Sequence, residues 1–314
     1  MLIYTLQRIG LALLICITSM CLLFGAIRMI PGDMATIMLG SRATQEMRDR
    51  LNHEMGLDRP VVVQLGIFLG HAATGDLGTD PVTQRTIGTI ILENLPYTLT
   101  LIGVALGWSA LIGIPLGCYS AIRRNTWIDR LTGVISVGTI SIPSFVVAIY
   151  ALLIFAIEVN WFPVIGAGEP GDLGDELWHL VLPSFAVGLG WVGYLARLVR
   201  ASMLEVMGEH HVRTARAFGL TEPKIVLHYA LRIAILPTVT MLALAIGSLL
   251  SSAVFAENIF SRPGIGKLIV DSAYVHNYPV VQGAVLTTVA LFAIAMPIAD
   301  LLIAWLDPRV RAGF

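Results

Sequence analysis

The residues of this chain that come closest to metal or catalytic chemistry are Glu209, His210 and His211, because carboxylate and imidazole groups are common zinc ligands. A zinc protease needs the spacing His-Glu-x-x-His, which places both histidines on one helix face with the glutamate as general base. Here the three residues are consecutive, so a helix would spread them around its axis. We interpret them as a solvated loop cluster, and no metal site is predicted.

Two glycine-rich stretches match nucleotide-binding motifs only in part. Gly188–Gly193 fits Gly-x-Gly-x-x-Gly, but it lies inside an apolar segment with no strand before it. Gly264–Leu268 lacks both the spacing and the hydroxyl residue of a phosphate-binding Gly-x4-Gly-Lys-Ser/Thr loop. The chain is therefore expected neither to bind a dinucleotide nor to hydrolyse ATP by itself, and no catalytic residue is assigned.

The amino-acid composition indicates the class of protein to which these motifs belong. Hydrophobic residues make up 56% of the 314 residues and charged residues only 13%, about half the share found in soluble domains. So few charges cannot cover the surface of a soluble domain of this size, and a net charge of -1 gives no basic excess for nucleic acid. The composition indicates an integral membrane protein and excludes an ordinary soluble enzyme, a disordered chain and a nucleic-acid binder.

Long apolar segments are the main elements of the sequence. A helix that crosses a membrane needs about 20 mostly apolar residues, because lipid leaves no other partner for its backbone groups. Six segments meet this condition: 9–27, 94–122, 131–157, 177–196, 233–256 and 280–306. The sequence therefore predicts an all-α integral membrane protein with about six transmembrane helices in a single domain over 1–314.

Small residues within 94–122 are expected to serve helix packing. The pairs Gly103/Gly107 and Gly113/Gly117 each place two glycines on one helix face. Such faces let two helices approach closely. The spacing is common, so it predicts packing and not a specific dimer.

The distribution of cations predicts the orientation of the chain. Of the 20 Lys and Arg residues, 12 lie in the 60 residues of segments 1–8, 123–130, 197–232 and 307–314. Only eight lie in the 108 residues of segments 28–93, 158–176 and 257–279. Because cytoplasmic loops are enriched in cations, both termini and the loop 197–232 are predicted to be cytoplasmic. Residues 28–93 form an external loop region.

Two other classes of membrane protein are weighed against the residues in the spans. An ion-coupled secondary carrier usually buries carboxylates or histidines along its ion path, each at a cost of about 2.5–3.5 kcal/mol. His179 and Asp300 lie near span ends, and no relay is evident between them. A membrane-embedded enzyme would need a nucleophile with a base, or a metal site, which the sequence also lacks. The pattern favours a membrane subunit that is powered by other proteins.

The cytoplasmic loop 197–232 carries the most informative pattern. Its centre, His211–Leu220, contains small alanines, two arginines and a glycine, which predicts a short helix ended by a glycine C-cap. A surface of small residues on such a helix suits docking into a groove of another protein. A basic loop near anionic lipid is the alternative, but such a loop would not need the pattern Ala-x-Ala-x-Gly.

This loop resembles the coupling loop of permease subunits in binding-protein-dependent ABC importers. It is most similar to the dipeptide/oligopeptide/nickel branch, whose loop is close to Thr-Ala-Arg-Ala-x-Gly-Leu, although Phe218 stands where lysine is frequent. The resemblance covers nearly the whole chain. Further family-like motifs begin, in order, at Pro31, Met55, Gly75, Leu95, Ile142, Glu257, Pro263, Tyr278 and Asp307.

The resemblance implies a type I ABC importer permease fold in the bacterial inner membrane, without catalysis or a cofactor in this chain. The implied partners are a second related permease subunit, which completes a heterodimer, two ATPase subunits and an external solute-binding protein. Membrane lipid surrounds the assembly, and no nucleic acid is involved. ATP and Mg would be bound by the ATPase subunits.

The resemblance also assigns residues to two surfaces. The residues expected to couple to the ATPase are Arg213, Thr214, Ala215, Arg216, Ala217, Gly219 and Leu220. The alanines would give close contact, the arginines would pair with acids, and the glycine would end the helix. The residues expected to contact the external binding protein are Trp161, Phe162 and Tyr278, with a place in the aromatic belt of the membrane as the alternative.

The resemblance leaves several substrates open. Members of the family carry short peptides, nickel or nickel chelates, glutathione and opine-like compounds, and the external binding protein sets much of the selectivity. Short peptides are the expectation from family frequency. The same architecture importing a metal chelate, glutathione or an opine-like solute is the alternative.

Overall fold

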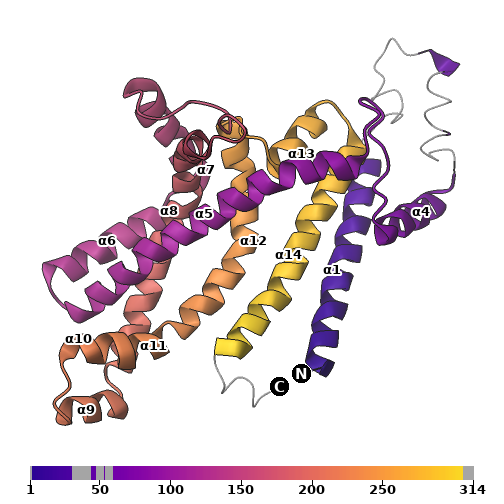
Figure 1. The fold of residues 1–314 in the computed structure, drawn as a ribbon. Coiled ribbons are helices and arrows are strands. Elements are labelled where there is room, and N and C mark those ends of the chain that lie inside the picture. The colour runs from indigo at the N-terminus through magenta and orange to yellow at the C-terminus, as the bar shows by residue number, and fades with distance from the viewer. Residues whose placement is uncertain (1, 30–43, 47–52, 54–58, 307–314) are drawn as a thin grey trace. The chain divides into compact units, whose positions relative to one another are not determined.

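Helices make up nearly all of the regular structure in the described part of the chain (Figure 1). The computed structural model describes all residues except 1, 30–43, 47–52, 54–58 and 307–314. The contacts divide the chain, expected from the sequence to be one domain, into two compact units. Unit 1 is Met1–Tyr97 with Pro263–Ile294, and unit 2 is Thr98–Arg262 with Ala295–Phe314.

Within the described residues, five helices are long and apolar enough to cross a membrane, and the number rises to six if one bent pair counts as a single span. This confirms the prediction of an all-α chain with about six spans. The five helices are α1 (Leu2–Arg28), α5 (Ile87–Ile122), α8 (Leu173–Val206), α12 (Leu236–Ile259) and α14 (Tyr278–Leu306).

The segment 131–157 differs from the straight span that its apolar run predicts. It bends by 96° between α6 (Trp127–Ser141) and the continuous pair α7 (Ser144–Ala151) and η1 (Leu152–Glu158), the latter a π-helix. The cause is Pro143, which has no N–H to donate and disfavours the helical conformation in the residue before it. Ile142 is accordingly extended, with φ -89° and ψ 121°. The segment is therefore two helices at a sharp bend, either one broken span or a re-entrant loop.

The other helices run beyond the apolar segments that identify them. α5 begins at Ile87, inside the region 28–93 expected as an external loop, and the same region also contains α4 (Val61–Thr74). α8 continues to Val206, well into the loop 197–232. Charged and polar residues can extend a helix past the apolar boundary, because the backbone bonds are satisfied within the helix wherever it emerges into water.

Unit 1 has a small apolar core of its own. It is built by the first part of α5, α13 (Ile265–Tyr274) and α14. The buried side chains that pack together are Ile87, Ile91, Ile265, Val280 and Ala284. The core holds the start of α5 against the helices that follow residue 263 in the sequence.

One buried carboxylate organises the turn that precedes α5. Asp80 is 3% exposed and accepts hydrogen bonds from the N–H groups of Val82 at 3.0 Å and Thr83 at 3.3 Å, and from the Asn277 amide at 2.6 Å. Burial acts to raise the pKa of Asp80, but the hydrogen bonds from Thr83, Val82 and Asn277 outweigh it and lower the pKa. The charged side chain thus ties the turn to the segment before α14.

α8 is the central helix of unit 2. The most apolar window of α8 is 61% buried, whereas the corresponding windows of α5 and α12 are each 28% buried. It packs against α6, α7, α12 and the short α11 (Leu231–Ala234). At its start, Asp172 Oδ1 accepts hydrogen bonds from the N–H groups of Gly174 at 2.9 Å and Asp175 at 3.2 Å, which caps the helix.

α5 and α8 approach so closely that two glycines of α5 have no room for a side chain. A Cβ atom on Gly113 would lie 2.9 Å from the carbonyl oxygen of Val192, and one on Gly117 would lie 2.3 Å from that of Ala196. Ser109 also donates a hydrogen bond to the carbonyl of Gly188 at 2.8 Å. The packing predicted for the pair Gly113/Gly117 is therefore present between α5 and α8.

A buried ion pair joins the start of α6 to α8. Asp129 is 6% exposed, and its Oδ2 accepts a hydrogen bond from Arg200 Nη2 at 2.8 Å. The same carboxylate accepts bonds from the Ser120 hydroxyl at 2.6 Å and from the N–H of Asn125 at 3.0 Å. Because every partner is oriented toward it, the carboxylate fixes α6 in place at this end.

We expect Asp129→Asn to lower the free energy of unfolding of the purified protein in detergent by about 2 kcal/mol. Breaking a fully buried pair costs about 3–5 kcal/mol, and the figure is reduced here because the Arg200 side chain is 32% exposed. The melting temperature measures the loss. Arg124→Gln, at an exposed position of the same turn, is the control, and equal melting temperatures for both variants would contradict a structural role of the pair.

Candidate functional site

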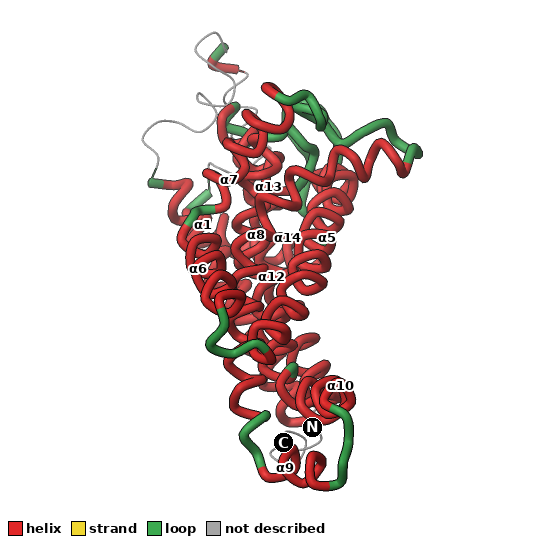
Figure 2. The backbone as a smooth tube through the Cα atoms, turned by 90° about the vertical axis from the view of Figure 1, so that its left-hand side faces the viewer, coloured by secondary structure: helices red, strands yellow, loops and turns green. Residues whose placement is uncertain are grey.

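The centre of the loop 197–232 is a short helix with a well-defined end. α9 (His210–Ala217) follows the turn after α8, and Figure 2 shows it with α10 (Glu222–Lys224) at one end of α8 and α12. Gly219 takes a φ of 76°, a left-handed conformation that favours glycine. The Gly219 N–H bonds the Arg216 carbonyl at 2.9 Å, and the Leu220 N–H bonds the Ala215 carbonyl at 3.3 Å. These two bonds form a Schellman motif, so the helix ends as the sequence predicts.

One face of α9 is buried against its own chain. Val212 is 0% and Ala215 is 5% exposed. They belong to an apolar cluster with side chains from the end of α8 and from the π-helix η2 (Ile225–Ala230), which include Val199, Met203, Val206, Ile225 and Val226. α9 is therefore packed onto η2, in a cluster that also contains side chains from the end of α8, so a force on α9 would reach α8 through this cluster.

The opposite face of α9 is exposed. It carries Arg213, Thr214 and Ala217, and it continues into Phe218, which is 81% exposed. A single exposed phenylalanine is common on protein surfaces. Beside a small alanine, it offers an apolar contact for a partner. Among the residues assigned to coupling, Ala215 lies on the buried face, so the expectation that it contacts a partner directly is not supported.

The two arginines of α9 have partners within the loop. Arg216 donates to both carboxylate oxygens of Glu222, at 2.7 Å from Nε and 3.3 Å from Nη2. The hydrogen bond from Arg216 lowers the pKa of Glu222, so this pair is charged at neutral pH. Arg213 donates to the carbonyl of Gly208 at 3.0 Å. Both side chains remain exposed, so binding of a partner to either would compete with these bonds.

The two histidines at the start of α9 do not form the solvated cluster that the sequence suggests, because His211 Nε2 is buried and has no hydrogen-bond partner among the described residues. His211 Nδ1 lies 3.0 Å from Glu209 Oε2, and His210 is exposed. Within the described residues, no group of three His, Cys, Asp or Glu side chains could hold a metal ion.

The three aromatic residues assigned to the external surface fall in different units. Trp161 is 62% exposed, and Phe162 is partly buried with its ring 4.5 Å from that of Trp178. These two belong to unit 2, whereas Tyr278 belongs to unit 1 and is only 6% exposed. Tyr278 therefore offers little surface to a partner, because its ring is part of the packing of unit 1.

The residue that sequence reasoning missed is Phe218. In the sequence, Phe218 stands out only as a departure from the family pattern. Its exposure follows from the structure, because the helix ends at Ala217. The available signal was an aromatic residue directly before the glycine stop of a polar helix. Such a residue lies at the helix end, where it has few neighbours of its own chain to cover it.

Comparison with known families identifies the chain. The family described as "Binding-protein-dependent transport system inner membrane component" matches residues 113–312, and the N-terminal part of the same system's membrane component matches residues 1–102. The chain belongs to this family. It is a permease of the peptide/nickel branch of ABC importers, as the resemblance of the loop indicates.

Curated relatives match the permease over almost its whole length. The "Glutathione transport system permease protein" of Escherichia coli K12 is 34% identical over 99% of both chains, and that of Salmonella paratyphi A is 35% identical over the same share. Two inward-facing structures of the MetNI methionine ABC transporter share its fold, with TM-scores of 0.57 and 0.59 at 17% and 19% identity. The match covers 69% of this permease and 96% of each solved chain.

Membership in the family establishes several of the expected properties. The permease is a multi-pass protein of the inner membrane and a non-catalytic subunit of an ABC importer. ATP is bound by partner ATPase subunits and not by this chain, and an external binding protein delivers the solute.

Proposed function

We propose that the permease forms one half of a translocation path for short peptides, with glutathione-like tripeptides among its substrates. The observation that carries this proposal is the match to glutathione permeases, at 34–35% identity over 99% of the chain. The second half of the path would be a related permease subunit. Selectivity for the solute in such systems depends largely on the binding protein.

We further propose that α9 is the contact with the ATPase. The exposed face with Ala217 and Phe218 would dock into a cleft of an ATPase subunit, while the buried face holds α9 in the apolar cluster that it shares with η2 and the end of α8. Closure of the ATPase dimer on ATP would then move α9 and the end of α8 together as a rigid body. Leu220 and Gly219 would hold the helix end in place through the Schellman motif.

On the external side, we propose that Trp161 and Phe162 contribute to the surface that receives the binding protein. They follow η1 in a loop that is held to α12 by the hydrogen bond from the Gly166 N–H to the Phe260 carbonyl at 2.9 Å. The segment 158–176, which includes this loop and the start of α8, contains five acidic residues and no Lys or Arg. A partner surface with basic residues would be complementary to it.

The substrate is tested by uptake into proteoliposomes that contain the complete transporter with its own binding protein. We expect ATP-dependent uptake of labelled glutathione or of a dipeptide, and none without ATP inside. A nickel chelate and an opine serve as competitor solutes. Uptake of either of these in place of peptides would overturn the peptide assignment. Uptake driven by an ion gradient alone would overturn the proposed coupling through α9 as well.

A further inference from the structure

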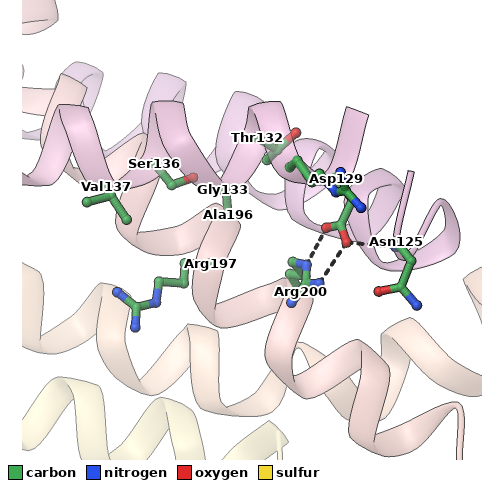
Figure 3. Close-up of a pocket in the computed structure, with 10 residues that line it drawn as sticks. Asn125, Asp129, Thr132, Gly133, Ser136, Val137, Ala196, Arg197 and Arg200 are labelled. Carbon is green, nitrogen blue, oxygen red and sulfur yellow. Dashed lines mark hydrogen bonds and ion pairs between the residues drawn. The ribbon is translucent and has the colours of Figure 1, made fainter. Parts of the chain in front are cut away.

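A pocket lies between α6 and α8, at the end of these helices that the cation bias places in the cytoplasm (Figure 3). It has a volume of about 380 Å³ and is separate from α9. α6 contributes Arg130, Ser136 and Val137 to its walls, and α8 contributes Arg197. Gly133 and Ala196 also line it.

The pocket carries two positive charges that no described residue neutralises. Asp129 and Arg200, at one end, pair with each other. Arg130 and Arg197 are exposed, and their side chains make no hydrogen bond or ion pair with any described residue. In Figure 3 the guanidinium of Arg197 points away from the Asp129–Arg200 pair. The remaining charge of the pocket is therefore that of two guanidinium groups, which suits an anion with several oxygens.

A buried hydroxyl without a partner points to a ligand in the same place. Ser136 lines the pocket and is 2% exposed, yet its Oγ has no hydrogen-bond partner in the described part of the chain. A buried polar group left unpaired costs about 1–3 kcal/mol, so such groups usually have a bound partner. Hydroxyl and guanidinium groups are both donors that bind phosphate oxygens, and the lining of this pocket offers both.

The side chains around the pocket indicate which kind of anion would bind there. The adjoining face of α6 is apolar and exposed: Trp127 is 72% exposed, Val134 is 70% exposed, and Val137, at the pocket itself, is 52% exposed. An exposed tryptophan at the cytoplasmic end of a span is typical of the lipid headgroup level. A ligand with an anionic head and apolar tails would satisfy the arginines, the hydroxyl and this apolar face together.

We propose that this pocket binds the phosphate of an anionic phospholipid from the cytoplasmic leaflet. The two arginines hold the phosphate oxygens, Ser136 donates a hydrogen bond to one of them, and the acyl chains lie along Val134 and Val137. Basic pockets between transmembrane helices on this side of a membrane are suited to such headgroups. The site does not depend on the identity of the transported solute.

The test measures lipid binding to the complete transporter, purified in detergent. Phosphatidylglycerol is titrated and its bound fraction is read by native mass spectrometry, with phosphatidylcholine and inorganic phosphate as comparison probes. We expect phosphatidylglycerol to bind more tightly than either. The double variant Arg130→Gln/Arg197→Gln should weaken its binding about 30-fold, because each cation near the surface contributes about 1 kcal/mol. Ser136→Ala should weaken it several-fold without removing a charge.

The matched control is Arg123→Gln/Arg124→Gln. It removes the same charge from two exposed positions of the neighbouring turn that do not line the pocket. Equal weakening by control and pocket variants would show a general charge effect and overturn the site. Equal binding of phosphatidylcholine would overturn the role of the anion. Inorganic phosphate that competes at the same concentration would assign the pocket to a free anion. No lipid bound in the complete complex would overturn the site.

Discussion

Gly117→Ala is expected to lower the stability of the permease by about 3 kcal/mol, although alanine is the better helix former by about 1 kcal/mol. The added Cβ atom would lie 2.3 Å from the carbonyl oxygen of Ala196 and 2.9 Å from the Cβ of Val199. Neither atom is the end of a flexible side chain, so α5 and α8 must separate. Overpacking of this kind costs about 1–3 kcal/mol, occasionally more, and a backbone clash belongs at the upper end.

The control for this prediction is Gly107→Ala, on the same helix. In the described part of the chain, no atom other than its own neighbours lies within 4 Å of a Cβ placed at Gly107. Only the helix propensity changes there, so Gly107→Ala should be neutral or stabilising by up to about 1 kcal/mol. The two variants are thus expected to shift the melting temperature in detergent in opposite directions. If both variants lowered the melting temperature by the same amount, Gly117 would not lie in a closer helix contact than Gly107.

This pair of variants also shows how far the sequence could predict the fold. The pairs Gly103/Gly107 and Gly113/Gly117 are equivalent as patterns, yet only the second pair meets α8 closely. Spacing states which residues share a helix face, but not which helix will cover that face. The spans themselves were predictable, because lipid leaves a backbone no alternative to a long apolar helix.

Local signals were reliable where the structure depends on local chemistry. The end of α9 follows from Gly219, whose positive φ is available at little cost only to glycine. The break of the span 131–157 follows from Pro143 and could have been derived from the sequence. The length and apolarity of the segment predict a span, but apolarity alone does not determine the direction of the helix.

Contacts between distant segments could not be predicted from the sequence. Glu257 is fully buried and accepts a hydrogen bond from Thr98 at 2.6 Å, across 159 residues of sequence. Its position directly after the apolar run 233–256 suggested an external loop, whereas α12 continues to Ile259. In the same way, the burial of Ala215 depends on residues of η2 that fold back onto α9. Neither pairing leaves a signal at the residue itself.

Ala217→Glu is expected to abolish ATP-driven uptake while the complex still assembles in the membrane. Ala217 lies on the exposed face of α9, so a longer, charged side chain can extend into water in the isolated permease without disturbing the apolar cluster. In the complete transporter it would occupy the space where a small residue meets the ATPase, beside Phe218. Uptake of labelled substrate and ATP hydrolysis are measured on the same proteoliposomes. We expect hydrolysis that no longer responds to the loaded binding protein.

Ala215→Glu separates this effect from a loss of folding. Ala215 is 5% exposed within the cluster around Val212 and Ile225, so a carboxylate there would lose its hydration without gaining a partner, at a cost of several kcal/mol. This variant should lower the melting temperature strongly, whereas Ala217→Glu should leave the free energy of unfolding within about 0.5 kcal/mol of that of the parent protein, as is usual for surface changes. If Ala217→Glu retained full uptake, α9 would not be the contact with the ATPase, because no small exposed residue would then be required at that point. If both variants lost stability equally, the two faces of α9 would not differ in the way that their burial indicates, and loss of uptake could not be assigned to coupling.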